Sequence, residues 1–254
     1  MEMIRESLKR TMAATFLVRV PDPKHHNFPT PFGSGFFVSP DGHFVTANHV
    51  IKDVADPTKI QLSHHAEAGH MGPILKEPEV VATSEEFDLA VLKFDFARHS
   101  NQEWAKDRDC FDFLEVDLNE HLEGTPVYSF GYPLPETKVE KKNAGGGSII
   151  VGMDWICPRV TSAIISSRWH MLGPIQKGGL SPVYVLDKAF NYGNSGGPIV
   201  LSESGKAIAA VIEFQPVAIK QPGGRVSIMV PSLYGVAAAL HTWKQGFQTL
   251  GVWK

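Results

Sequence analysis

An all-β fold that ends in one helix is the architecture this sequence predicts. Short β-branched and aromatic runs recur along the chain, and the turns between them draw on 23 glycines and 18 prolines. The last part differs, because apolar residues from Leu233 to Leu250 recur at steps of three and four, the spacing of one helical face. At 254 residues with 43% hydrophobic content, the chain can form one domain with a sizeable core.

Charge and cysteine content narrow the class of protein. A net charge of -3 provides no basic surface for nucleic acid or anionic membrane, so neither is expected as a partner. Secreted proteins of this size more often carry several disulfides, whereas only Cys110 and Cys157 occur here. The N-terminal residues lack the apolar region of a signal peptide, and no run is long enough to span a membrane. These features predict a cytoplasmic protein.

The first half of the chain contains a short helix followed by strands. Residues 3–11 favour the helix, and Ser39-Pro40-Asp41-Gly42 is a hairpin turn between two of the strands. The strands are expected at residues 15–20, 33–38, 43–47, 79–83 and 87–94.

A polar segment at residues 53–79 interrupts these strands and contains three histidines, His64, His65 and His70. No carboxylate or cysteine accompanies them at a recognised ligand spacing, so a solvated loop is favoured over a metal site. The sequence thus predicts no metal and no other cofactor.

The second half repeats the strand pattern. Residues 138–148, Lys138 to Ser148, are rich in glycine and lysine, which favours a disordered surface loop over a mobile active-site or regulatory loop. Residues 232–250 form the predicted amphipathic helix, which we expect to dock on this half. The strands are expected at residues 125–130, 149–151, 159–165, 183–186, 199–201, 207–214 and 226–230.

The segment Gly193-Asn194-Ser195-Gly196-Gly197-Pro198 presents a serine on sharply turning backbone. If Ser195 is a nucleophile, the N–H groups of Gly193 and Ser195 can point into one space and stabilise an oxyanion. A plain glycine-rich turn uses the same residue types. The segment alone leaves both interpretations open.

Two other residues provide the groups that an activated serine needs. His49 ends a strand after the small residues Thr46 and Ala47, and imidazole exchanges protons near neutral pH. Asp88 begins an apolar strand, where a buried carboxylate needs a hydrogen-bond donor such as an imidazole. A structural histidine and a turn-capping aspartate are the alternatives. Together with Ser195 they form a possible base, orienting acid and nucleophile.

Four motifs that occur in order resemble trypsin-like serine proteases, and among them the HtrA/DegP branch: Gly33-Ser34-Gly35-Phe36, Thr46-Ala47-Asn48-His49-Val50, Asp88-Leu89-Ala90-Val91-Leu92 and Asp187 to Pro198. The resemblance implies two six-stranded antiparallel β-barrels within one protease domain, at about residues 13–120 and 121–231, followed by the helix at 232–250. It implies that His49 is the base, Asp88 the orienting acid and Ser195 the nucleophile. It also implies an oxyanion hole at Gly193, Asn194 and Ser195.

Several residues depart from the resembled pattern. No PDZ domain fits after residue 250, and Tyr192 stands where HtrA-type motifs have proline, which leaves the geometry of the oxyanion loop open. Asn194 stands where pancreatic enzymes have an aspartate that pairs with a newly cut N-terminus, and an amide cannot form that ion pair. We therefore predict that activity requires no N-terminal cleavage.

Substrate preference follows from the residues around the specificity pocket that the resemblance implies. Ala189 at its base carries no charge to pair with lysine or arginine, and Phe190 is larger than the usual aliphatic residue. The predicted substrate-binding residues are Ala189, Phe190, Ile212, Glu213 and Phe214. They predict cleavage after small or medium apolar residues.

The sequence thus predicts a serine endopeptidase that acts on a protein or peptide substrate, with a regulatory protein as a further partner. Two alternatives remain at this point. One is a catalytically silent module of the same fold that binds peptides or a partner, and the other is an esterase that uses the same acyl-transfer groups.

Overall fold

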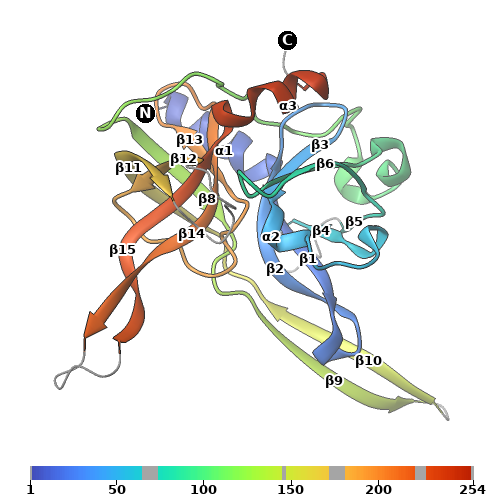
Figure 1. Ribbon diagram of the computed structural model, residues 1–254. Helices are drawn as coiled ribbons and strands as arrows, with labels where there is room; N and C mark the ends of the chain where they lie inside the picture. The colour runs from blue at the N-terminus through green and yellow to red at the C-terminus, as the bar shows by residue number, and fades with distance from the viewer. Residues whose placement is uncertain (1, 65–73, 145–146, 172–180, 221–226, 253–254) are drawn as a thin grey trace.

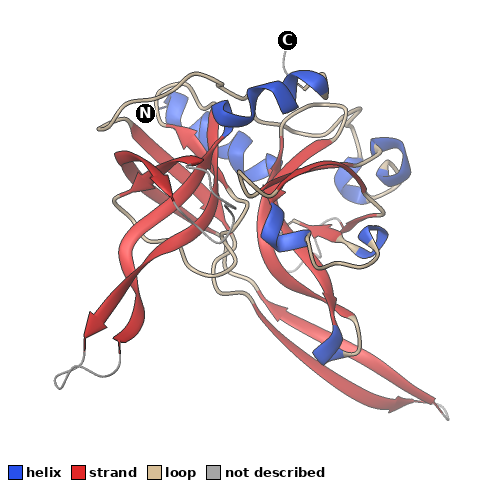
Figure 2. Ribbon diagram, viewed as in Figure 1, coloured by secondary structure: helices blue, strands red, loops and turns tan. Residues whose placement is uncertain are grey.

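The computed structural model describes residues 2–64, 74–144, 147–171, 181–220 and 227–252. Two strand-rich halves lie side by side, and short helices lie at their periphery (Figure 1). Strands dominate both halves, and a helix lies near each end of the chain (Figure 2). The all-β double-barrel architecture predicted from the sequence is confirmed.

The N-terminal half is a seven-stranded antiparallel sheet in the order β5-β4-β1-β2-β3-β7-β6. It therefore has one strand more than the predicted six. The additional pairing comes from β4 and β5 within the segment expected to be a loop, because Leu62 and Leu75 there are fully buried. The strands are β1 Thr15–Asp22, β2 Phe28–Phe37, β3 His43–Ala47, β4 Gln61–Ser63, β5 Ile74–Lys76, β6 Glu79–Ser84 and β7 Leu89–Lys93.

Aromatic rings fill the core of this half. Phe37 stacks on Phe111 with ring centroids 4.3 Å apart, and it meets Phe16 and Phe44 edge to face at 5.4 and 5.0 Å. Offset stacking and edge-to-face contacts are the favoured arrangements of aromatic pairs. The short helical segments η2 Pro57–Lys59, η3 Phe96–His99 and η4 Glu103–Ala105 lie in the connections around this core.

The C-terminal half is a closed barrel of six strands in the order β11-β12-β15-β14-β13-β8. Small and β-branched side chains pack its interior, among them Ile199, Ala209 and Ala237, each fully buried. Its strands are β8 Pro126–Gly131, β11 Arg159–Met171, β12 Ser181–Leu186, β13 Pro198–Leu201, β14 Ala207–Lys220 and β15 Ser227–Ala239.

A two-stranded ribbon replaces the disordered loop predicted for Lys138 to Ser148. Strand β9 Glu136–Ala144 pairs antiparallel with β10 Gly147–Trp155 and projects away from both halves (Figure 1). Residues 145 and 146 at its tip lie outside the described residues. The prediction was wrong because it relied on amino-acid composition, which does not show whether the backbone finds a partner. Here nine consecutive cross-strand pairs between β9 and β10 order the backbone.

The C-terminal helix is shorter than the predicted residues 232–250. Residues up to Ala239 belong to β15, then η5 Leu240–Trp243 leads into α3 Lys244–Thr249. Val236 pairs with both Val185 and Glu213, so this segment is an interior strand that closes the barrel. The helical spacing of Leu233 and Val236 was therefore coincidental.

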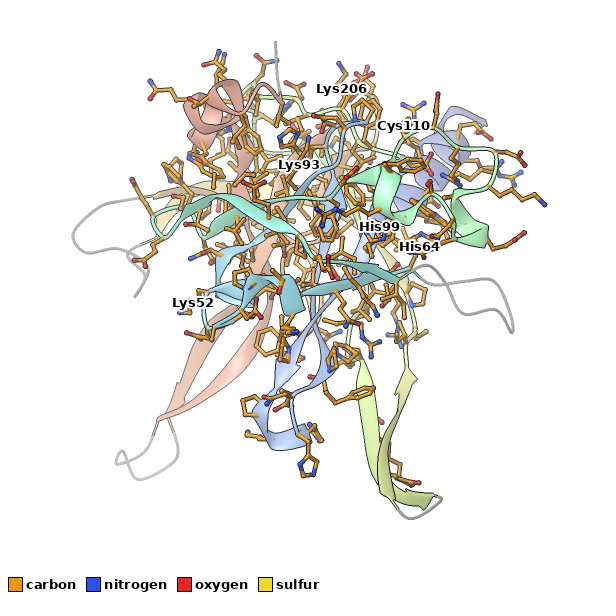
Figure 3. All side chains as sticks on the ribbon, turned by 90° about the vertical axis from the view of Figure 1, so that its right-hand side faces the viewer. Lys52, His64, Lys93, His99, Cys110 and Lys206 are labelled. Carbon is orange, nitrogen blue, oxygen red and sulfur yellow. The ribbon has the colours of Figure 1, made fainter. Side chains whose placement is uncertain are left out.

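The N-terminal helix α1 Glu2–Ala14 extends the predicted one by a few residues and joins the two halves. The hydroxyl groups of Ser7 and Thr11 lie 2.6 and 2.9 Å from the Tyr128 hydroxyl on β8. Among the described residues, no helix has the length and hydropathy needed to cross a bilayer. Figure 3 shows the face of the N-terminal half that carries Lys52, His64, Lys93 and His99.

Candidate active site

His49 lies where β3 ends and the short helix α2 Asn48–Ile51 begins. Ala47 is extended, so the chain turns abruptly from strand to helix between two buried neighbours, Asn48 and Val50. The His49 side chain remains 34% exposed. An imidazole in this position has a fixed backbone and an open edge, as a base that exchanges protons with a substrate requires.

Asp88 holds His49 through both carboxylate oxygens. Asp88 Oδ2 lies 2.6 Å from His49 Nδ1, and Asp88 Oδ1 accepts a 2.8 Å hydrogen bond from the His49 backbone N–H. The backbone N–H of Asn48 donates to the Asp88 carbonyl at 2.9 Å. Asp88 is 3% exposed and has a left-handed φ of 51°, which an aspartate adopts only at a cost in free energy. Its contacts with residues 48 and 49 offset that cost.

Ser195 stands in a tight turn between Asn191 and β13. Gly193 and Gly196 on either side have φ values of 94° and 86°, which favour glycine. The turn also leaves no room for side chains, since a Cβ on Gly196 would lie 2.1 Å from the Ser34 carbonyl oxygen. These glycines keep Ser195 half-buried at the surface of the turn.

The Ser195 hydroxyl donates a 3.4 Å hydrogen bond to the carbonyl oxygen of Ile212. Ile212 is the extra residue of a β-bulge, because Val211 pairs with Ala237 and Glu213 with the adjacent Val236. Bulges redirect backbone groups and are frequent near active sites. The structure thus joins His49 to Asp88 directly, while the Ser195 hydroxyl engages the neighbouring strand.

Two backbone N–H groups of the turn lack an acceptor among the residues that the structure describes. The N–H groups of Gly193 and Ser195 donate to no other residue in the described part of the chain, whereas Asn194 N–H donates to Asn191 O at 3.1 Å. Of the three residues predicted for an oxyanion hole, Gly193 and Ser195 therefore have available donors. Asn194 does not.

Sequence reasoning identified Ser34 only as part of a motif, yet it contacts the turn directly. Its hydroxyl donates to the Gly193 carbonyl at 2.7 Å, and its backbone N–H donates to the Ser195 carbonyl at 2.7 Å. Ser34 and Gly193 are 159 residues apart in sequence. The fold is needed to show that they meet.

A cavity of about 540 Å³ lies beside His49, and sequence reasoning missed it. The Phe32 and Tyr192 rings meet edge to face at a centroid distance of 5.8 Å. Burial, and then the negative charge of Asp22, raise the pKa of the Tyr192 hydroxyl. The cavity walls include Pro21, Asp22, Phe32, His49, Asp53 and Tyr192.

The predicted specificity residues occupy different environments. Ala189 is exposed, whereas Phe190 is 4% exposed and belongs to the core of the C-terminal barrel. Ile212 is 5% exposed, and Glu213 and Phe214 continue β14 beyond it. Their predicted contacts with substrate remain predictions.

The histidines of residues 53–79 were considered as metal ligands. His64 Nε2 lies 2.8 Å from the Met12 carbonyl oxygen, while His65 and His70 lie outside the described residues. In the part of the chain that the structure describes, no cluster of three His, Cys, Asp or Glu residues could hold a metal ion.

Comparison with curated proteins finds serine endoproteases. The "probable periplasmic serine endoprotease DegP-like" of Bartonella henselae is 30% identical over 175 residues, 68% of this chain and 26% of the relative. The protein of the same name from Rickettsia conorii is 29% identical over 170 residues, 66% of this chain and 26% of the relative. The chain spans about a quarter of the length of these relatives.

The names of these relatives contradict the cytoplasmic location predicted from the cysteine content and the N-terminal sequence, because both are named as periplasmic. Cysteine content was a poor guide to compartment here. A domain with extensive aromatic and aliphatic cores does not depend on disulfides, and Cys110 and Cys157 are both free thiols.

Solved structures share the fold. A serine endoprotease from Yersinia pestis has a TM-score of 0.57 at 22% identity, covering 97% of this chain and 66% of that one. The HtrA-type protease AlgW with a decapeptide has a TM-score of 0.61 at 18% identity, with the same coverage. Residues 33–209, which include His49, Asp88 and Ser195, match the trypsin-like peptidase domain family. This chain therefore belongs to the trypsin-like peptidase family, and its relatives are of the DegP and HtrA type.

Proposed function

We propose that the chain is a serine endopeptidase that cleaves peptide bonds through an acyl-enzyme. The observation that carries the proposal is that the buried Asp88 carboxylate is hydrogen-bonded to both the ring and the backbone N–H of His49. It fixes the Nδ1–H tautomer, so that Nε2 is the basic nitrogen. The family match over residues 33–209 supports the same conclusion.

In the first step, Ser195 Oγ attacks the carbonyl carbon of the substrate and its proton passes to His49 Nε2. The carbonyl oxygen becomes an oxyanion, and the N–H groups of Gly193 and Ser195 are the available donors that would stabilise it. The C–N bond then breaks, and His49 returns the proton to the leaving nitrogen. Water repeats the sequence on the acyl-enzyme and releases the acid.

Before this attack, the Ser195 hydroxyl has to exchange its acceptor. It leaves the Ile212 carbonyl for His49 Nε2, which requires rotation about the Cα–Cβ bond. A 3.4 Å hydrogen bond is long for a hydroxyl donor, so its loss costs little. Catalytic hydrogen bonds often tighten only when substrate is bound.

The substrate is proposed to be a protein or peptide with a small or medium apolar residue before the scissile bond, because Ala189 carries no charge. The residues before the bond would pair with β14 at 212–214. The cavity beside His49 would take residues after the bond, since His49 must reach the leaving nitrogen. Faster cleavage after arginine than after valine in a peptide library would contradict the assignment of Ala189.

A fluorophosphonate probe tests the proposed function, because it reacts only with an activated serine. We expect the wild type to be labelled and to cleave an unfolded protein, and Ser195→Ala to do neither. Absence of labelling in the folded wild type would favour the silent module of the same fold. Labelling and ester hydrolysis without cleavage of any peptide would favour an esterase.

A further inference from the structure

We propose that Ser34 is a positioning residue that fixes the two oxyanion donors from the opposite half of the molecule. The proposal rests on the proposed function, because it assigns Ser34 a role in stabilising the oxyanion. Ser34 is fully buried on β2, and it does not touch the reacting atoms. Its effect would act through the turn that carries Ser195.

The Ser34 side chain joins the turn to the barrel behind it. Its hydroxyl donates to the Gly193 carbonyl at 2.7 Å and accepts from the Tyr132 backbone N–H at 3.2 Å. Tyr132 directly follows β8 in the C-terminal half, whereas Ser34 belongs to the N-terminal half. A single hydroxyl thus satisfies a buried donor and a buried acceptor, and both would be orphaned without it.

The Ser34 backbone holds the other end of the same turn. Its N–H donates to the Ser195 carbonyl at 2.7 Å, and its own carbonyl accepts a 2.8 Å hydrogen bond from Thr46 Oγ1 on β3. One residue therefore grips the turn at Gly193 and at Ser195. These are the two residues whose N–H groups remain available.

The planarity of the peptide bond connects these contacts to the donors, because each carbonyl shares a plane with the next N–H. Ser34 holds the plane from Gly193 to Asn194 and the plane from Ser195 to Gly196. The opposite edges of those planes donate to Asn191 O at 3.1 Å and Val211 O at 2.6 Å. Both planes are fixed on two sides.

Along the turn, the peptide planes that carry the available N–H groups of Gly193 and Ser195 alternate with the two planes whose carbonyl groups are hydrogen-bonded to Ser34. The plane with Gly193 N–H is tied through the Tyr192 carbonyl to Leu134 N at 2.7 Å. The plane with Ser195 N–H is tied through the Asn194 carbonyl to Gly197 N at 2.8 Å. Each of these two planes is held by one hydrogen bond of its own, and its orientation otherwise depends on the adjacent peptide planes. Ser34 supplies an anchor to a neighbour of each.

Backbone atoms of both halves lie close to the two glycines of the turn. A Cβ on Gly196 would lie 2.1 Å from the Ser34 carbonyl oxygen, and a Cβ on Gly193 would lie 2.3 Å from the Tyr132 carbonyl oxygen. The hydroxyl therefore acts on a turn already pressed against both halves. Its removal would free the Gly193 carbonyl without opening a void large enough to refill with water.

The test compares Ser34→Ala with Thr46→Val, which removes the buried hydrogen bond from the Thr46 hydroxyl to the Ser34 carbonyl but removes no hydrogen bond to the turn itself. For Ser34→Ala we expect kcat to fall by about 10- to 100-fold with KM within about threefold, since loss of a whole oxyanion donor costs about 100- to 1000-fold. Affinity for a peptide aldehyde, which forms the tetrahedral adduct, should fall by the same factor. For Thr46→Val we expect kcat within about threefold of wild type.

The pH profile separates positioning of the donors from damage to the base. Because the His49 and Asp88 contacts do not involve Ser34, the acidic limb of kcat against pH should keep its midpoint in Ser34→Ala. A shifted midpoint, or a kcat equal to that of Thr46→Val at equal loss of Tm, overturns the proposal. So does a raised KM with unchanged kcat.

Ser34→Cys keeps the test decisive if Ser34→Ala does not fold. A thiol has a similar shape and is a weaker donor, so kcat should lie between the alanine variant and the wild type, and wild-type kcat would overturn the proposal. Fluorophosphonate labelling distinguishes the two levels of failure. An unlabelled wild type refutes the proposed function, whereas equal labelling rates of wild type and Ser34→Ala refute only the role of Ser34.

Discussion

The pair of His49 and Asp88 and the turn around Ser195 are built in different ways. The pair forms inside the N-terminal half, where β7 follows β3 in the sheet and brings residues 39 apart into contact. The turn around Ser195 belongs to the C-terminal half but is hydrogen-bonded to Ser34 of the other half. One unit is complete within its own sheet, and the other depends on the contact between halves.

This difference indicates where each unit is vulnerable. The pair depends on the charge and the two acceptor oxygens of the Asp88 carboxylate, which is buried. The turn depends on shape, because the carbonyl oxygens of Tyr132 and Ser34 lie where a Cβ on Gly193 and on Gly196 would be. A change of charge should therefore break the first unit, and a change of volume the second.

The largest effect is expected from Asp88→Asn. An amide cannot serve both His49 N–H groups as an acceptor, so the ring loses the tautomer with a basic Nε2, and kcat should fall by about 10,000-fold. Steady-state hydrolysis of a peptide substrate measures this loss. The matched control is Asp109→Asn, an exposed aspartate of the same half, for which we expect wild-type kcat. Similar kcat in both variants would contradict the role of Asp88.

A smaller but structural effect is expected from Gly196→Ala. Gly196 and Gly124 have similar left-handed φ values of 86° and 84°, but a Cβ on Gly124 would meet nothing within 4 Å. Gly124→Ala should therefore lose about 1–2 kcal/mol of unfolding free energy from backbone strain alone. Gly196→Ala adds the clash with Ser34 and should lose several kcal/mol together with activity, as measured by urea unfolding. Equal losses would show that packing at Ser34 is unimportant.

The smallest effect is expected from two histidines away from either unit, the buried His99 and the half-buried His241. Burial lowers the pKa of both imidazoles below the usual 6.5. The unfolded chain therefore binds protons that the folded chain excludes, so stability present above pH 6.5 is lost as pH falls toward the lowered pKa values. Tm should decrease as the pH is lowered from about 7 to about 5, and this decrease should be smaller in His99→Gln than in the wild type. An identical slope in that variant would remove His99 from the explanation.

Much of the fold could be predicted because strand signals are local. Asp41-Gly42 marks a hairpin, and the apolar run after Asp88 marks the strand that pairs with β3. The segment from Leu233 to Ala239 could not be assigned in this way. Its alanines favour helix intrinsically, while its pairing with β12 and β14 depends on strands far away in sequence.

In the candidate site, too, residues with local sequence signals could be predicted, whereas residues whose role depends on distant contacts could not. His49, Asp88 and Ser195 could be proposed because their chemistry is specific and their motifs are short. Ser34 and Phe32 could not be given roles, because a serine between glycines and an isolated phenylalanine have no distinctive chemistry. Their importance lies in what they meet, Gly193 across 159 residues and Tyr192 across the cavity wall.

The hydrogen bonds from Ser34 of the N-terminal half to the turn around Ser195 have a consequence for folding during synthesis. With the proposed roles, a nascent chain that has folded only its N-terminal half possesses the base His49 and the carboxylate of Asp88 but lacks the nucleophile Ser195. A C-terminal half on its own possesses the serine, but the carbonyls of Gly193 and Ser195 lack the Ser34 contacts that hold them. On the proposed assignment of His49, Asp88 and Ser195, hydrolysis can begin only when the two halves have docked, so that the peptidase would appear only after both halves have been synthesised.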